Sequence, residues 1–395
     1  MLSGVEALPR VHFDCAQCDK AWYLQNPSTL TKQTVKTSTT AIKLICALGL
    51  AFMLSNPSGA QTSKTLKEAY KNYFPIGVAV APRNLSGPEA ELITTQFSSI
   101  TPENSMKMGP IHPEPDRYAW EQADAIVAFA QKNGLKVRGH NLCWHNQSPK
   151  WFFTDNDGKQ VTREVLLDRM KEHINAVAGR YKGKVYVWDV VNEAVPDTSE
   201  SIYRKSKFYE IIGEDYIEKA FEYAHAADPD AKLFYNDYNT ESAKKREKIY
   251  QLLKKLKAKN VPVHGVGLQG HWSIYEPTAA DLEKSITQFA SLGLEVQITE
   301  LDLSVYPKEH ERRAKKSTDE GVLTPEMVTK QTAQYKMLFD VFRKHKGTIT
   351  SVTFWNVSDK STWLDNFPVP NRKDYPLLFD ENYKLKPAFK QVVDF

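Results

Sequence analysis

Two uninterrupted apolar runs that each end in a carboxylate constrain this chain more than any other feature of its sequence. The first, residues 185–193, is β-branched and aromatic up to Asn192 and Glu193. The second, residues 294–300, is built in the same way and ends in Glu300. Such runs are typical of strands that are buried on both faces. An unpaired buried carboxylate lowers the stability of the fold by on the order of several kcal/mol, so each of these two must be paired or used in function. Since both follow buried strands, we expect the two carboxylates to face one cleft.

Short apolar strands alternate with amphipathic helices from Thr65 onward. The alternation predicts a (β/α)8 TIM barrel of the α/β class, in a single catalytic domain. We expect its strands over residues 74–80, 99–102, 135–140, 185–193, 232–236, 266–269, 295–300 and 348–355. We expect its helices over residues 89–97, 120–133, 162–181, 208–227, 242–259, 279–292, 324–344 and 386–395. The basic residues of the helix over 242–259 are expected to form a solvated face.

A doubly wound open sheet is the alternative fold for such an alternation. That fold binds ligands at one switch point and often carries a Gly-x-Gly-x-x-Gly after its first strand. This chain has no such motif after residues 74–80, and polar residues follow its strands throughout. The barrel therefore explains the pattern better.

Residues 1–60 are predicted to be a leader that precedes the barrel domain of residues 61–395. Their apolar segment, residues 41–54, is too short for a membrane span. Lysines precede it and small residues follow it, with a cleavage point after Ala60. This pattern predicts a signal peptide and a secreted or periplasmic protein that has no membrane attachment after cleavage. An uncleaved N-terminal anchor is the alternative, and residues 1–30 can reflect a mis-chosen start codon.

Charge and cysteine content argue against two other classes of protein. The net charge is +4, and the leader carries five Lys or Arg against three Asp or Glu, which leaves only +2 for the domain. This charge is too weak to indicate nucleic-acid binding. Of the four cysteines, only Cys143 lies in the domain, so neither a disulfide framework nor a zinc site is indicated. We expect a monomer.

The predicted strands end in a set of polar and aromatic side chains. In a (β/α)8 barrel the chemistry takes place at these carboxyl ends. Two carboxylates with amides, histidines and tryptophans suit glycoside hydrolysis, in which one carboxyl is protonated and the other is ionised. A metal site of His140, His145 and His271 is the alternative, but no His-Glu-x-x-His is present. A serine hydrolase is disfavoured because no Gly-x-Ser-x-Gly occurs.

Six stretches resemble motifs of glycoside hydrolase family 10, the endo-β-1,4-xylanases, and the resemblance extends from about residue 65 to the C-terminus. The resemblance implies that the chain hydrolyses xylan, arabinoxylan or xylo-oligosaccharides with retention of configuration and without a cofactor or metal. It implies Glu193 as the acid/base and Glu300 as the nucleophile, with their carboxyl groups about 5–5.5 Å apart. The six stretches are residues 101–107, 139–145, 188–193, 267–272, 298–302 and 354–363.

The same resemblance implies the roles of further residues by matching position. Asn192 would hold the nucleophile and the sugar 2-hydroxyl, while His271 and Asp302 would keep Glu300 ionised. The sugar beside the cleaved bond would contact Lys107, His140 and Gln269, and the next sugar would contact Glu103 and Asn104. The pocket walls would be Trp144, Trp355 and Trp363, and the last two would crowd the hydroxymethyl group of glucose.

Two departures from the family pattern are Met108, where an aromatic is common, and Cys143, where a small aliphatic is common. The leaving-side sugars would meet irregular loops such as residues 307–323, which leaves the preferred chain length open. A β-1,4-glucanase on the same barrel is one alternative function. A carbohydrate-binding protein without activity is another, but such proteins usually lack a catalytic carboxylate, and both are present here.

Overall fold

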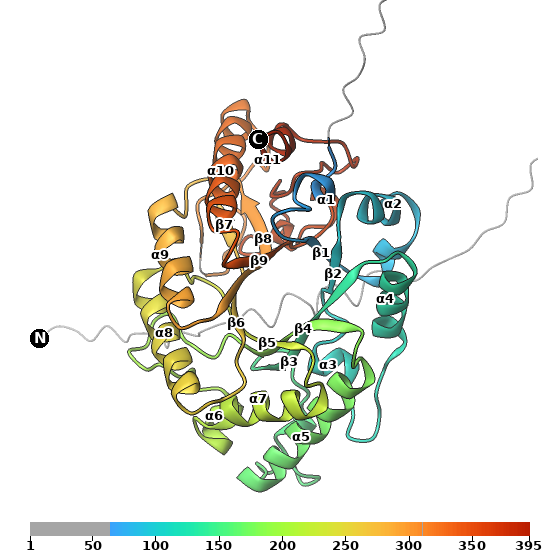
Figure 1. Cartoon of the computed structure of the whole chain (residues 1–395), viewed down its shortest axis with the longest axis vertical. Coiled ribbons are helices and arrows are strands. Elements are labelled where there is room, and N and C mark those ends of the chain that lie inside the picture. The colour runs from blue at the N-terminus through green and yellow to red at the C-terminus, as the bar shows by residue number, and fades with distance from the viewer. Residues whose placement is uncertain (1–63, 310) are drawn as a thin grey trace, which may run out of the picture.

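Short runs of β-branched and aromatic residues form a closed parallel barrel, which confirms the predicted TIM barrel (Figure 1). The computed structural model describes residues 64–309 and 311–395. Each strand pairs in parallel with its neighbour, and the last strand pairs with the first to complete the ring. The ring consists of β1 (Ile76–Val80), β2 (Ser99–Pro102), β3 (Lys136–Trp144), β4 (Val185–Asn192), β5 (Lys232–Asp237), β6 (Gly265–Leu268), β8 (Glu295–Ser304) and β9 (Ile349–Phe354).

Two short strands share the sixth position of the ring. β6 is followed by Gln269 and Gly270, and then by β7 (His271–Ser273). Gly270 has a φ of 82°, a conformation that glycine adopts readily and other residues rarely do. Both β6 and β7 pair in parallel with β8. The sequence predicts only the first of them, because the interruption leaves β7 just three residues long.

Helices cover the outside of the barrel (Figure 1). Several begin where the sequence places a capping threonine: the hydroxyls of Thr162, Thr278 and Thr324 each accept a hydrogen bond from a first-turn backbone N–H. The longer helices are α2 (Gly87–Gln96), α4 (Glu121–Lys132), α5 (Arg163–Arg180), α7 (Tyr216–Ala227), α8 (Ala243–Ala258), α9 (Ala279–Ala290), α10 (Pro325–Lys344) and α11 (Pro387–Val393). The short helices are α1 (Leu66–Ala69), α3 (Met108–Ile111) and α6 (Lys207–Ile212).

The structure corrects two of the predicted helices. The helix expected over residues 208–227 is broken into α6 and α7 at Gly213, which has a φ of 101°. The basic residues of the helix expected over residues 242–259 are not all solvated. Lys245 at the start of α8 is only 2% exposed, and its Nζ lies 2.9 Å from an Asp237 oxygen and 3.0 Å from an Asp197 oxygen. These partners lie far away in the sequence, so helical periodicity alone could not indicate them.

The predicted leader lies outside the described residues, so its signal peptide stays a prediction. Among the residues that the structure describes, no helix is both long enough and apolar enough to cross a membrane. The described chain begins near its own C-terminal helix, since α1 lies beside α11 (Figure 1) and the Tyr70 hydroxyl donates to the carbonyl oxygen of Val392 at 2.7 Å.

Charged residues inside the barrel are paired with one another. The Arg138 guanidinium donates to Asp189 and Gln297, and all three side chains are at most 2% exposed. The opposite face of β4 carries Trp188, next to Asp189 in the sequence, and this indole is also fully buried. Gly139 on β3 leaves space for that indole, because a Cβ at this position would lie 2.1 Å from Trp188 Cε3.

We therefore expect Gly139→Ala to lower the free energy of unfolding by about 1–3 kcal/mol, the usual cost of overpacking a core. Gly179→Ala in the last turn of α5 is the matched control, because a Cβ there meets nothing within 4 Å. It should change the free energy by less than about 1 kcal/mol, in the stabilising direction. Equal urea midpoints for Gly139→Ala and the wild type would contradict the packing described here.

Candidate active site

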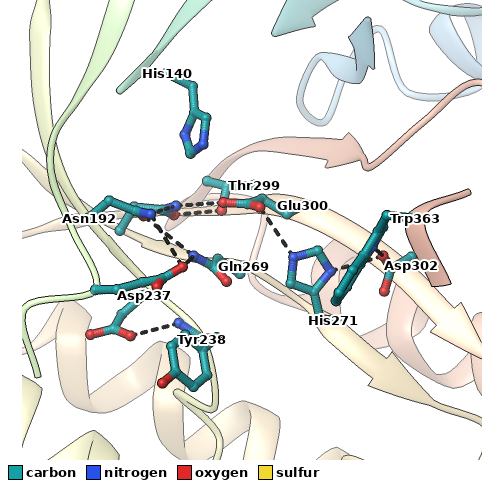
Figure 2. Close-up of polar contacts among 12 residues, drawn as sticks. His140, Asn192, Asp237, Tyr238, Gln269, His271, Thr299, Glu300, Asp302 and Trp363 are labelled. Carbon is teal, nitrogen blue, oxygen red and sulfur yellow. Dashed lines mark hydrogen bonds and ion pairs between the residues drawn. The ribbon is translucent and has the colours of Figure 1, made fainter. Parts of the chain in front are cut away.

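Glu300 lies in the middle of β8, which continues to Ser304, and is almost completely buried, with 5% of its surface exposed. Two neighbours contact its carboxylate oxygens (Figure 2). The Asn236 amide on β5 donates to Oε1 at 2.8 Å, and Nε2 of His271 on β7 lies 3.2 Å from Oε2. Three different strands therefore build the environment of this carboxylate.

Behind His271 lies a second carboxylate, Asp302, two residues further along β8. Its Oδ2 is 2.9 Å from His271 Nδ1 and also accepts a hydrogen bond of 2.7 Å from the indole N–H of Trp363 (Figure 2). His271 is thus held at both ring nitrogens by carboxylates. A histidine between two carboxylates is stabilised in its protonated form.

The pKa values of Glu300 and His271 are shifted in opposite directions. Burial alone would raise the pKa of Glu300, but the hydrogen bond from His271 and electrostatic interactions with His140, His271 and Lys107 lower it to about 2. Burial would lower the pKa of His271, but Asp302 and Glu300 raise it to about 10. At neutral pH Glu300 is therefore an anion and His271 a cation.

Glu193 follows β4 and has a different environment from that of Glu300. Its Oε2 accepts a hydrogen bond of 2.9 Å from the indole N–H of Trp144. Its Oε1 accepts from the Gln269 amide at 2.9 Å and from the Asn192 amide at 3.3 Å. Glu193 is half-buried, and these three donors are neutral groups. Two carboxyl groups with such unequal surroundings can act as an ionised group and a proton donor in one reaction.

Two asparagines connect the carboxyl groups. The Asn236 amide nitrogen donates both to Glu300 and, at 2.9 Å, to Asn192 Oδ1. Asn236 Oδ1 in turn accepts a hydrogen bond of 2.6 Å from Thr299 Oγ1. Asn192 is thus linked to Glu300 through Asn236, and its predicted role in holding the nucleophile and the sugar 2-hydroxyl stays a prediction. The oxygen of Asn192 accepts from Asn236, which turns the amide nitrogen of Asn192 toward Glu193.

Aromatic rings line the site on the side of β9. The Trp355 ring packs edge-on between two histidines, with its centroid 5.3 Å from that of His140 and 6.2 Å from that of His271. Trp363 lies with its centroid 4.9 Å from His271 and stacks on Phe367 at 5.4 Å. Both tryptophans are therefore held by other rings, as the walls of a pocket would be.

The residues after β2 join the site through Lys107. Its Nζ donates to Asn104 Oδ1 at 2.8 Å and lies 4.9 Å from the centroid of Trp144. Glu103 accepts a hydrogen bond of 3.3 Å from the Asn356 amide, which comes from the loop after β9. The loops after β2, β3 and β9 thus meet along one rim of the site.

Contacts of this kind link the site residues that the sequence predicts, except Glu103, whose side chain contacts Asn356 and Arg83 instead, and the roles of all of them stay predictions. Sequence reasoning assigned no role to Asn236 or Thr299. Asn236 is the last residue of the strand predicted over residues 232–236, so it was visible as a strand-end residue, whereas nothing in the apolar run of β8 distinguished Thr299. Among the described residues, no group of three or more His, Cys, Asp or Glu side chains is arranged to hold a metal ion. The alternative metal site of His140, His145 and His271 therefore has no support in the geometry.

Comparison with known proteins gives a family match over the whole described domain. The family model "Glycosyl hydrolase family 10" matches residues 65–395. A "Beta-1,4-xylanase" of Dictyoglomus thermophilum is 50% identical over 352 residues, which cover 89% of this chain and 96% of the relative. "Endo-1,4-beta-xylanase A" of Caldicellulosiruptor saccharolyticus is 48% identical over 332 residues, which cover 84% of this chain and 96% of the relative.

Solved structures agree with these relatives in fold. Xylanase XynB from Paenibacillus barcinonensis, complexed with a conduramine derivative, superposes with a TM-score of 0.81 at 45% identity and covers 85% of this chain and 99% of that one. A mutant protein solved in complex with xylotriose superposes with a TM-score of 0.80 at 47% identity and covers 84% of this chain and 99% of that one.

We expect His271→Ala to raise the pKa of Glu300. The substitution removes a hydrogen bond and a positive charge but leaves most of the burial, so the pKa should move from about 2 to at least the ordinary value of 4.5. A carboxyl-carbon NMR titration measures this shift directly. His264→Ala is the matched control, because His264 is half-buried next to the start of β5 and accepts from the backbone N–H of Leu233. An unchanged Glu300 pKa in His271→Ala would contradict the electrostatic account.

Proposed function

The chain belongs to glycosyl hydrolase family 10 as an endo-1,4-β-xylanase, and we propose that it cleaves xylan with retention of configuration through a covalent intermediate on Glu300. The observation that carries this proposal is the unequal environment of the two carboxyl groups. Glu300 is an anion held by His271 and Asn236, whereas the carboxyl group of Glu193 accepts its hydrogen bonds from neutral donors. A retaining glycosidase needs one ionised nucleophile and one acid that can also act as a base.

In the first step, a Glu300 oxygen attacks the anomeric carbon of the sugar. The bond from that carbon to the glycosidic oxygen breaks, and Glu193 donates its proton to the departing oxygen. The low pKa of Glu300, about 2, means that the nucleophile needs no deprotonation at working pH. The cation His271 holds the Glu300 carboxylate in place until the carboxylate loses its negative charge on forming the bond to the sugar.

In the second step, water attacks the anomeric carbon from the side that the leaving group vacated. Glu193, now ionised, takes the proton from that water, and the bond between the sugar and Glu300 breaks. Two inversions at one carbon give overall retention. The separation of about 5–5.5 Å between the carboxyl groups, which this mechanism needs, stays a prediction.

The neighbouring residues support the binding of xylose units. We assign Lys107, His140 and Gln269 to the sugar beside the cleaved bond, and Glu103 and Asn104 to the next sugar. Trp144, Trp355 and Trp363 form the walls, and the last two would crowd a hydroxymethyl group. A hydrolase of this specificity meets its polymeric substrate outside the cytoplasm. We therefore also propose that residues 1–60 direct export to the periplasm or the medium and that the mature enzyme is monomeric.

We expect Glu300→Ala to abolish the release of reducing sugar from xylan, because no nucleophile remains. Glu193→Ala should cost at least roughly 10²–10⁴-fold in kcat/KM on substrates with poor leaving groups. Glu326→Ala, an exposed position on α10, is the control and should retain the full rate. Release of xylose oligomers by Glu300→Ala at a rate near that of the wild type would refute the assignment.

Substrate class has its own test. Rates on xylan and on carboxymethyl cellulose should differ in favour of xylan, because the tryptophan walls leave little room for the extra hydroxymethyl group. A rate on carboxymethyl cellulose equal to or above that on xylan would favour the alternative of a β-1,4-glucanase.

A further inference from the structure

Glu193 has an unusual backbone conformation for a residue with a side chain. It directly follows β4, and its φ is 58°, in the left-handed region that non-glycine residues rarely adopt. Such a conformation is strained and persists only where the surroundings hold it. Its backbone N–H donates to the carbonyl oxygen of Asn236 at 2.9 Å, so β5 holds one side of this peptide.

Arg204 holds the other side. Its Nε donates to the carbonyl oxygen of Glu193 at 2.8 Å, and its backbone N–H donates to the carbonyl oxygen of Ala194 at 2.7 Å. Ala194 is 3% exposed, and Val195 after it is completely buried. At this position the chain turns away from the barrel, and burial limits access by water. Arg204 therefore supplies a hydrogen-bond donor to the carbonyl oxygen of Glu193.

A second contact fixes the guanidinium itself. Arg204 Nη2 donates to the hydroxyl of Tyr238 at 2.9 Å, and Tyr238 directly follows β5. The Tyr238 ring lies 3.3 Å from the Nζ of Lys245, which is buried and paired with Asp237. Figure 2 shows Tyr238 next to Asp237, on the Gln269 side of the site. Arg204 thus ties the backbone of Glu193 to a rigid, charged cluster at the end of β5.

Electrostatics agree with this geometry. Burial would lower the pKa of Arg204, but Tyr238, Glu193 and Asp237 raise it above its ordinary value, so the guanidinium keeps its charge. The side-chain end of Glu193 is held separately, by Trp144 and Gln269. The backbone end depends on Asn236 and Arg204.

We propose that Arg204 is a positioning residue for Glu193, which holds the left-handed backbone of the acid/base so that its carboxyl group reaches the glycosidic oxygen. This inference rests on the proposed role of Glu193. A merely structural role for Arg204, such as anchoring residues 194–206, would reduce activity on all substrates equally. A positioning role would reduce activity according to how much the leaving group needs a proton.

The test compares Arg204→Met with the wild type on two substrates. Xylopentaose has a poor leaving group that needs protonation, whereas the 2,4-dinitrophenyl glycoside of xylobiose has a leaving group that departs without it. We expect kcat/KM on xylopentaose to fall by about 10–100-fold, because small misplacements of a catalytic group have costs of this size. On the dinitrophenyl glycoside, kcat/KM should stay within about 3-fold of the wild-type value. This ratio reports only the first step, and in that step the leaving group needs no proton from Glu193.

The same variant has a second signature on the dinitrophenyl glycoside. The second step needs Glu193 as a base, so kcat and KM should fall together as the covalent intermediate accumulates. Arg204→Lys keeps one donor and the charge, and it should recover part of the lost xylopentaose activity. If circular dichroism and thermal unfolding show that Arg204→Met does not fold, Arg204→Lys takes its place in the comparison of the two substrates.

Arg169→Met is the matched control. Arg169 is half-buried like Arg204 and also donates to backbone carbonyl oxygens, those of Trp151, Phe152 and Thr154. It should change both substrates by the same factor. Glu193→Ala must first be shown to lower kcat/KM more on xylopentaose than on the dinitrophenyl glycoside. If it does, an equal loss of kcat/KM on both substrates in Arg204→Met, or no loss, would overturn the inference. If Glu193→Ala itself fails to discriminate, the assignment of the acid/base is wrong, and the role of Arg204 falls with it.

Discussion

A buried negative charge on Glu300 is the constraint on which the rest of the site depends. Its carboxylate is 5% exposed, and an unpaired ion in such a position would take up a proton or destabilise the fold. His271 prevents this, and Asp302 keeps His271 charged. The indole N–H of Trp363 is hydrogen-bonded to the same Asp302 oxygen. One electrostatic chain therefore connects Glu300, the proposed nucleophile, to Trp363, a proposed wall of the sugar pocket.

The relative position of the two carboxyl groups follows from strand register. Asn192 on β4 pairs with Asn236 on β5, and Asn236 pairs with Gly267 on β6. A Cβ at position 267 would lie 2.2 Å from Asn236 Oδ1, so glycine there leaves space for the amide that touches both Asn192 and Glu300. The parallel barrel thus sets the spacing between Glu193 and Glu300 through backbone pairing and two amides, before any substrate binds.

The sequence predicts the strands and their polar ends well, because a buried parallel strand is a local pattern and Glu193 and Glu300 each interrupt one. It predicts the fold for the same reason. It could not predict that Asn236 contacts Glu300 or that the Asn192 amide faces Glu193, since both depend on register between strands. The burial of Lys245 and the break at Gly213 were also missed, because the partners of Lys245 are distant and a single glycine did not interrupt the helical periodicity.

The central claim, that Glu300 forms a bond to the sugar, is tested most directly by trapping that bond. A 2-deoxy-2-fluoro xylobioside with a dinitrophenyl leaving group forms the intermediate quickly but releases it slowly, because the fluorine destabilises both transition states and the leaving group offsets this only in the first step. Mass spectrometry after proteolysis should find the fluorinated disaccharide on the peptide that contains Glu300. A label on another residue, or inactivation without any label, would contradict the account.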